Sequence, residues 1–344
     1  MKAEKLINVS KQLLIASGCD TAEAQTLSQI LVWCDQVGRH NQGVWRLPLL
    51  TRRFAKGLIK SPCNPEIKQT SSSVCNMNAD EGSGHYIAYL AMEKAIEIAH
   101  KTGVGIVGVN NSNFFGAGAY YINQACESGM ISIGMSNSFP KVAAYGGVKS
   151  VLGTNPFAFG APRQKGNHFL LDMATSSSAG SSITKSSEQG AMLKEGIAID
   201  SKGDPITDPD QVASGSLLPF GGAKGFGLSL MVEILSGVIT GAGFSHGVKS
   251  MYKNFDESGD NGHFFIAIDI EKLIPIENYY SRIEALITSV KASAEGFNDK
   301  EVILPGEMRW EQYETSLDQG ISLDRETTDS LNQLSKQLEV ELNW

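Results

Sequence analysis

The spacing of apolar residues predicts helices in the first part of the chain. Apolar side chains recur three or four positions apart in residues 4–16, which is typical of an amphipathic helix. Asp20 followed by Glu23 resembles a capping box, so we expect a second helix to begin there and to continue to Cys34. Gly38 can end that helix, and residues 44–55 show helical spacing again. The first 60 residues are therefore predicted to be mainly helical.

Strand-like segments alternate with helical segments from about residue 65 onwards. Apolar runs with strand character occur at 104–110, 131–135, 168–174 and 263–269, and helical spacing occurs at 86–101, 118–128, 225–240 and 327–342. Such an alternation is typical of an α/β protein.

Composition and charge narrow the class of protein. A length of 344 residues with 42% hydrophobic content allows a substantial core and two lobes. The charged fraction of 19% and the 36 glycines fit a compact α/β protein better than a disordered or coiled-coil chain. The net charge of −8, without a long basic run, argues against a nucleic-acid partner. The five cysteines are odd in number and lack C-x-x-C spacing, so neither a disulfide framework nor a structural zinc site is predicted.

The start of the chain gives no sign of export or of membrane insertion. Residues 1–20 mix Lys, Glu, Asn and Gln into their apolar positions, unlike the apolar region of a signal peptide. No run of about 18 apolar residues occurs anywhere. We therefore expect a cytoplasmic protein that has no membrane partner.

Residues 103–108 match the pattern G-x-G-x-x-G of dinucleotide-binding folds. In those folds the motif follows a strand and opens a helix whose N-terminus faces a pyrophosphate. Here a predicted helix precedes the glycines, which lie within the strand-like run itself. We attribute the match to coincidence, and a Rossmann fold is not predicted from it.

Two other segments offer groups that can hold a ligand. In residues 218–230, Gly221 and Gly222 permit a tight turn and Lys224 stands where a helix begins. Backbone N–H groups and an ammonium there can form an anion cradle, but a helix-opening turn with a solvated lysine explains the residues equally well. In residues 152–162, Thr154 and Asn155 precede a proline, which favours an extended turn. Such a turn can present a hydroxyl and an amide to a ligand, although a structural turn is the simpler interpretation.

Only one of the six histidines, His40, lies in a polar, glycine-flanked segment. The histidines and carboxylates show no metal-ligand spacing, so no metal site is predicted. A single histidine of this kind is more often structural than catalytic.

Several stretches form a series that covers most of the chain: GVWRLP (43–48), GVGIVGVNNSNFFGAGAYY (103–121), VLGTNPFAFGAP (151–162), LLDMATS (170–176), GIAIDSKGDPITDP (196–209), LPFGGAKGFGLSLMVEILSG (218–237) and LPGEMR (304–309). In this order they resemble the malate/L-lactate dehydrogenase family of the non-Rossmann type. That family also includes sulfolactate, ureidoglycolate and diketogulonate oxidoreductases and Δ1-pyrroline-2-carboxylate reductases. GTNP, LDMATS and GGAKG in series are its specific motifs.

The resemblance implies an oxidoreductase that uses NADP or NAD and exchanges hydride with a small 2-oxo or 2-hydroxy acid or a cyclic imino acid. It also implies a homodimer and a family-specific α/β fold. In that fold residues 1–70 and 310–344 would form a mainly helical lobe, and residues 71–309 a mixed-sheet lobe that binds cofactor and substrate.

Site residues follow from the same resemblance. Arg46 matches the arginine expected to hold the substrate carboxylate, because a guanidinium pairs with both oxygens at once. Thr154 of the GTNP motif is expected near the substrate, together with Phe114 and Ser138. The residues expected to contact the cofactor are Phe115, Gly116, Ala117, Gly118, Asp172, Met173, Ala174, Ala223, Lys224, Gly306, Glu307 and Met308.

The positions at which relatives handle protons differ in this chain. Relatives have Ser-His-Gly where this chain has Asn41-Gln42-Gly43, and glutamine can donate a hydrogen bond but cannot deliver a proton near neutral pH. The second family histidine corresponds to Phe114, and the Asp or Lys that follows the ATS segment corresponds to Ser182.

Two explanations would keep such an enzyme active. His40 could turn inward as a replacement imidazole, or an iminium substrate could arrive already protonated and need only hydride. Lys141 is a further candidate acid without a known place. The leading hypothesis is an oxidoreductase with atypical chemistry, in which Asn41 and Gln42 shape the site. The alternative is a catalytically silent homologue that binds a dinucleotide or a small acid as a sensor or partner subunit.

Overall fold

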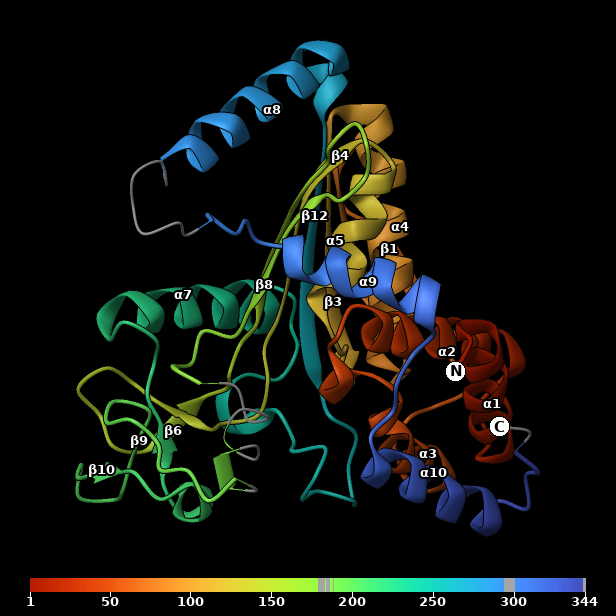
Figure 1. The fold of residues 1–344 in the computed structure, drawn as a ribbon, viewed down its shortest axis with the longest axis vertical. Helices are drawn as coiled ribbons and strands as arrows, with labels where there is room; N and C mark the ends of the chain where they lie inside the picture. Colours follow the sequence, from red (N-terminus) through yellow and green to blue (C-terminus); the bar gives the residue numbers. More distant parts are fainter. Residues whose placement is uncertain (179–182, 184–185, 188, 294–300, 343–344) are drawn as a thin grey trace.

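The computed structural model describes residues 1–178, 183, 186–187, 189–293 and 301–342. A sheet of seven strands, a second sheet of five strands and surrounding helices make up the fold (Figure 1). The helices are α1 (Ala3–Ala16), α2 (Thr21–Gln36), α3 (Leu47–Ala55), α4 (Gly84–Thr102), α5 (Gly118–Glu127), α7 (Ala223–Glu233), α8 (Ile276–Ala292), α9 (Glu307–Gln319) and α10 (Arg325–Gln337). The strands are β1 (Glu66–Gln69), β2 (Val74–Asn78), β3 (Val104–Ser112), β4 (Met130–Ser136), β5 (Val142–Ala143), β6 (Ser150–Leu152), β7 (Phe157–Ala161), β8 (Phe169–Met173), β9 (Ala198–Ile199), β10 (Pro205–Ile206), β11 (Ser216–Leu217) and β12 (Asn261–Asp269).

Helices from both ends of the chain pack together. Helices α1, α2, α3 and α10 share one apolar core, against which Met1 and Leu342 also pack (Figure 1). The predicted start of α2 is confirmed, because Oδ1 of Asp20 accepts a hydrogen bond from the backbone N–H of Ala22 at 2.8 Å. The prediction of a full capping box is wrong. The carboxylate of Glu23 does not return to the cap and instead accepts from the backbone N–H of Cys63 at 2.7 Å.

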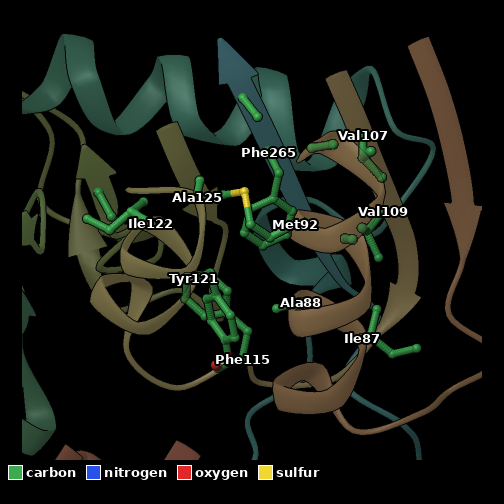
Figure 2. Packing of buried hydrophobic residues seen from close by; sticks show 14 of the residues in the cluster. Ile87, Ala88, Met92, Val107, Val109, Phe115, Tyr121, Ile122, Ala125 and Phe265 are labelled. Atoms are coloured by element: carbon green, nitrogen blue, oxygen red, sulfur yellow. Dashed lines mark hydrogen bonds between the residues drawn. The ribbon is translucent and has the colours of Figure 1, made fainter. Parts of the chain in front are cut away.

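The large sheet has the strand order β1-β2-β3-β12-β4-β7-β8, and β2 and β3 are its parallel pair. Helices α4 and α5 cover one face, and α7 with the π-helix at Ile234–Val238 packs on the other. Side chains of a strand alternate between faces, so Phe265 of β12 joins the α4–α5 core while Phe264 faces α7. Figure 2 shows Phe265 beside Met92 and Tyr121 in that core. The helix predicted at 225–240 is an α-helix only as far as Glu233, and the π-helix continues it to Val238.

The glycines of the G-x-G-x-x-G match have packing roles. A Cβ atom on Gly105 would lie 2.0 Å from the carbonyl oxygen of Ala95 in α4, and one on Gly108 would lie 3.0 Å from Cγ2 of Thr240. These glycines therefore let a helix and a turn approach β3 closely. The structure is a mixed α/β fold with mixed sheets, so the expectation of a non-Rossmann α/β fold is confirmed.

The small sheet has the order β10-β9-β11-β5-β6 and its own apolar core. The chain first enters it through residues 137–141, between β4 and β5, and returns through residues 153–156, between β6 and β7, before it enters again after β8 to form β9, β10 and β11. Both connections therefore lie at the junction of the two sheets. No helix among the described residues is long and apolar enough to cross a bilayer.

Candidate active site

The loop that leads to Arg46 wraps around a buried carboxylate. Asp35, in the last turn of α2, accepts a hydrogen bond from the backbone N–H of Val44 at 2.8 Å and contacts Nδ1 of His40 at 3.0 Å. A Cβ atom on Gly43 would lie 2.2 Å from an oxygen of the Asp35 carboxylate. The loop therefore requires glycine at this position, and Asp35 fixes the backbone from which Arg46 projects.

The imidazole of His40 lies beside the carboxylate of Asp35 and in the field of Asp324. Its hydrogen bond with Asp35 raises its pKa, partial burial lowers it, and the charges of Asp35 and Asp324 raise it further. Burial in turn raises the pKa of Asp35. Among the described residues, the His40 ring hydrogen-bonds Asp35, and no hydrogen bond joins that ring to Arg46.

The guanidinium of Arg46 is enclosed by aromatic rings. Its carbon lies 5.0 Å from the ring centre of Trp45, 5.2 Å from that of Phe114 and 5.6 Å from that of Tyr252. Nε donates to the backbone carbonyl of Asn41 at 2.7 Å, and Nη1 contacts the hydroxyl of Tyr252. Only 6% of the residue is exposed, and no carboxylate within the described part of the chain pairs with it. A buried cation without a counter-ion is costly, so this position favours an anionic ligand.

Two neighbouring polar side chains are also unsatisfied. Oε1 of Gln42 is buried, and among the described residues it has no hydrogen-bond partner. Both ring nitrogens of His85 are also buried without a hydrogen-bond partner among the described residues. The centre of this ring lies 5.6 Å from the ring centre of Phe114, in an edge-on arrangement. Burial and the charge of Arg46 lower the pKa of His85 to about 3, so its imidazole is neutral. The sequence interpretation missed His85, because only the fold brings the first turn of α4 to this loop.

The predicted cofactor residues of the loop after β3 and of β8 lie together. Oδ2 of Asp172 accepts a hydrogen bond from the backbone N–H of Ala119 at 3.1 Å, at the start of α5, and lies 3.5 Å from Nη2 of Arg309. Nη1 of Arg309 is buried and has no partner in the described part of the chain. The ring of Phe115 stacks on His263 in the core, so this residue can offer only its backbone to a ligand. Arg309 was not identified from the sequence.

Thr175, which was not predicted to belong to the site, joins three of the motifs. The hydroxyl of Thr175 in the ATS segment donates to the backbone carbonyls of Thr154 at 3.1 Å and Asn155 at 3.0 Å. Its carbonyl accepts from the backbone N–H of Phe220 at 3.1 Å, just before the GGAKG turn. Thr175 thus ties GTNP, LDMATS and GGAKG to one place. Ala223 and Lys224 open α7 there, exposed and without a side chain that caps the helix.

A buried amide positions the two hydroxyl residues predicted near the substrate. Oδ1 of Asn155 accepts from the backbone N–H of Ser138 at 3.0 Å, and its Nδ2 donates to Glu233 at 2.6 Å. The hydroxyls of Ser138 and Thr154 then lie 3.3 Å apart. Phe139, the next residue, meets the ring of Tyr252 with centres 6.0 Å apart, and Tyr252 contacts Arg46. The structure therefore connects Arg46 with the junction of the two sheets through Tyr252, which the sequence did not indicate.

The remaining predicted residues are Gly306, Glu307 and Met308, which lie at the start of α9, and Ser182. Glu307 pairs with Lys291 at 2.6 Å and accepts from a backbone N–H at 2.9 Å, while Met308 is largely exposed. A cavity of about 450 Å³ lies beside Glu307, but its lining includes none of the predicted substrate residues. Gly306 has a positive φ of 102° and begins the turn into α9. Ser182 lies outside the described residues.

Comparison with known proteins gives a consistent result. The family model of malate/L-lactate dehydrogenase matches residues 1–332. The malate dehydrogenase of Pyrococcus abyssi is 38% identical over 98% of this chain and 94% of its own length. The L-sulfolactate dehydrogenase of Methanothermobacter thermautotrophicus is 33% identical over 98% of this chain and 97% of its own length. The solved structure of malate dehydrogenase from Pyrococcus horikoshii OT3 superposes with a TM-score of 0.90 at 34% identity, covering 99% of this chain and 96% of that one.

Proposed function

The chain belongs to the malate/L-lactate dehydrogenase family, and we propose that it transfers hydride between a nicotinamide cofactor, NAD or NADP, and a small 2-oxo or 2-hydroxy acid or a cyclic imino acid. The observation that carries this proposal is the buried guanidinium of Arg46, which has no acidic partner within the described part of the chain. A substrate carboxylate would supply the missing charge and pair with two guanidinium nitrogens.

The residues of the second cluster fit a dinucleotide. Beside Asp172, Nη1 of Arg309 is buried and has no partner among the described residues, and none of their side chains caps the start of α7 next to Lys224. The buried guanidinium nitrogen, and the helix start that no side chain of the described residues caps, both favour phosphate oxygens. Gly116 has a positive φ of 78°, and a Cβ atom there would lie 2.6 Å from Nε2 of His85, so only glycine allows this loop path. When bound, the nicotinamide would supply or accept the hydride.

The side chains of the site would then bind and orient the substrate. Arg46 would hold the carboxylate, and the hydroxyls of Thr154 and Ser138 would contact polar atoms of the substrate. Gln42 would offer its amide as a hydrogen-bonding group without transferring a proton. Phe114 and the other rings around Arg46 would exclude water, which strengthens the ion pair.

An exposed apolar face supports the further proposal of a homodimer. An apolar stripe with four-residue spacing runs along α7 and the π-helix and consists of Leu230, Ile234 and Val238. The exposed fractions of these residues are 41%, 47% and 55%, respectively. Such a stripe on a helix is typical of an interface. Light scattering after gel filtration should give a dimer, and Ile234→Asp should shift the protein towards the monomer. A monomeric wild-type protein would contradict the proposal.

The cytoplasm is the compartment we propose, because the five cysteines are all free thiols.

Cofactor binding and turnover test the proposed function in two steps. NADH and NADPH should each be titrated with protein while nucleotide fluorescence is recorded, and at least one should bind. Turnover should then be measured with pyruvate, oxaloacetate, 2,3-diketogulonate and Δ1-pyrroline-2-carboxylate. Binding without turnover of any of these would favour the catalytically silent homologue, and absence of binding by either nucleotide would overturn the proposal.

A further inference from the structure

The reduction of a 2-oxo acid needs a proton donor, and His40 is the one predicted catalytic position whose side chain titrates near neutral pH. Gln42 and Phe114 have no ionisable proton near neutral pH. His85 lies beside Phe114, but its pKa of about 3 leaves it without an acidic proton to give. His40 is hydrogen-bonded to Asp35. A different group must protonate the carbonyl oxygen if the substrate is a 2-oxo acid.

Lys141 lies at the end of the connection between the two sheets, and its backbone is fixed on both sides. Its N–H donates to the carbonyl of Leu152 at 2.8 Å, and its carbonyl accepts from the N–H of Leu217 at 2.8 Å. Ser138, three residues earlier, is held by Asn155. The side chain of Lys141 therefore projects from a backbone that is held on both sides.

The ammonium of Lys141 faces the same ring as Arg46. Its Nζ lies 5.6 Å from the ring centre of Tyr252 and 5.1 Å from that of Phe139. The carbon of the Arg46 guanidinium is also 5.6 Å from the Tyr252 ring centre. The distance between Nζ of Lys141 and the guanidinium carbon of Arg46 cannot exceed the sum of their distances to the Tyr252 ring centre. A small substrate held by Arg46 is therefore within reach of the flexible side chain of Lys141.

The electrostatic surroundings make this ammonium a better acid. The charged groups that act on it are Lys253 and Arg46, and no carboxylate within the described part of the chain pairs with it. Partial burial of the ammonium, followed by these two positive charges, lowers the pKa of Lys141. A lowered pKa brings an acid closer to the working pH, which improves proton transfer. The residue as a whole remains exposed, so solvent can return the proton.

We propose that Lys141 is the general acid of this site and donates a proton from Nζ to the carbonyl oxygen of a 2-oxo acid whose carboxylate is held by Arg46. This inference rests on the proposed function. The carbonyl π bond breaks towards oxygen while a C–H bond forms with the electron pair of the hydride, whose source is the reduced nicotinamide. Oxygen takes the proton, and Nζ becomes a neutral amine that is protonated again by water. In the oxidation the neutral amine acts as the base.

The substitution Lys141→Arg separates proton transfer from charge. Arginine keeps the positive charge but does not release a proton near neutral pH. With oxaloacetate or pyruvate, kcat should fall by roughly 10²- to 10⁴-fold while KM stays close to the wild-type value. With Δ1-pyrroline-2-carboxylate, which binds as a protonated iminium, the loss should be much smaller. Lys253→Arg is the matched control, since it keeps the charge at a neighbouring lysine, and its kcat should not change.

Two readouts do not need the loaded enzyme. The rate of acetylation of Lys141 as a function of pH, followed by mass spectrometry, should give a pKa below the usual lysine value of about 10.4. Oxamate, an unreactive analogue of a 2-oxo acid, should quench the tryptophan fluorescence, to which Trp45 contributes, equally in wild type and Lys141→Arg, because the carboxylate clamp is intact. A pKa at or above the usual lysine value would count against the proposal.

The outcomes separate this inference from the proposed function. If the wild type reduces a 2-oxo acid and Lys141→Arg keeps its kcat, Lys141 is not the acid although the enzyme assignment holds. If the variant keeps kcat but shows a changed KM, Lys141 is only a binding cation and the proposal is overturned. If the wild type reduces none of the substrates, the proposed function and the role of Lys141 are overturned together.

Discussion

Two fully buried histidines lie in different surroundings. Burial lowers the pKa of both His263 and His85 to about 3, so both rings are neutral. The nitrogens of His263, in the centre of the large sheet, lie 2.9 Å from the hydroxyls of Ser136 and Ser112. Neither nitrogen of His85, beside the Arg46 loop, has a partner in the described part of the chain.

The difference distinguishes a region built for stability from one built for a ligand. A buried polar group that loses its partner costs about 1–3 kcal/mol, so folded proteins satisfy such groups wherever stability alone matters. The ring of His263, with a hydroxyl partner for each nitrogen, follows this rule. Around Arg46 and Asp172, in contrast, Gln42 and Arg309 also keep buried polar atoms that have no partner among the described residues. A bound substrate and cofactor would supply the missing partners.

Among the side chains expected to bind the ligands, the largest effect is expected at the carboxylate clamp, Arg46. Arg46→Met should lower kcat/KM by roughly 30- to 5000-fold, since removing one partner of a buried charge pair costs about 2–5 kcal/mol. Arg46→Lys should recover part of the loss, because it restores the charge but not the paired donors. Steady-state kinetics measure the effect, and circular dichroism checks the fold. A Met variant with unchanged kcat/KM would show that the unsatisfied region is not a carboxylate site.

A core substitution should affect stability and leave the site intact. Phe265 is fully buried in the α4–α5 core, and Phe265→Ala should lower the free energy of unfolding by about 3–5 kcal/mol through the cavity that it leaves. Urea denaturation followed by circular dichroism measures this change. Phe264→Ala, on the other face, is the control and should cost less, because that side chain belongs to a smaller cluster. KM should be unchanged in folded Phe265→Ala, and an altered KM would contradict the separation of the two regions.

The two histidines should respond to substitution in opposite ways. His263→Leu leaves the hydroxyls of Ser112 and Ser136 without their partner and should lower the free energy of unfolding by about 1–3 kcal/mol. His85→Leu removes two nitrogens that have no partner among the described residues, so it should be neutral or stabilising.

Activity provides the second half of this comparison. His85→Leu should lower kcat/KM by about 10- to 100-fold if its ring bonds a charged ligand, which is the range for hydrogen bonds of about 1.5–3 kcal/mol. His263→Leu should keep kcat/KM per folded molecule. Urea unfolding and kinetics on the same preparations test both statements, and a strong loss of stability in His85→Leu would show that a buried partner completes its ring in solution.

The sequence predicted the long elements of the fold, because their periodicity is local. Helices α2, α4 and α5 and strands β3, β4 and β12 lie where apolar spacing indicated them. The small sheet escaped prediction because strands such as β9 have two residues, too few to show a period. Helix α8 carries apolar residues at helical spacing, so its signal was present in the sequence and was overlooked.

The candidate site divides in the same way. Arg46, Ser138 and Thr154 belong to motifs that can be recognised in the sequence, although their roles stay predictions. His85, Arg309 and Tyr252 join the site through contacts between residues far apart in the chain, and no local pattern announces such contacts. Sequence alone could also not show that His40 is bound to Asp35, because that contact depends on the turn at Gly43.

The smallest expected effect concerns the pH dependence of the His40–Asp35 pair. The hydrogen bond to Asp35 raises the pKa of His40 above its usual value of 6.5, so the folded state binds this proton more tightly than the unfolded state. Its contribution to stability is fully present below pH 6.5 and is lost as the pH rises through the raised pKa. Because the side chain is 51% exposed, the contribution should stay below about 1 kcal/mol.

His40→Gln isolates that contribution. The free energy of unfolding should be higher in the wild type than in the variant, and this difference should be larger at pH 6 than at pH 9. Urea denaturation at both pH values measures it. A difference that grows with pH would contradict the hydrogen bond as the cause. Kinetics on the same variant address the alternative acid: if His40→Gln loses as much kcat as Lys141→Arg, the histidine does turn to the substrate. If kcat is retained, His40 supports the Arg46 loop from its outer side, as its bond to Asp35 suggests.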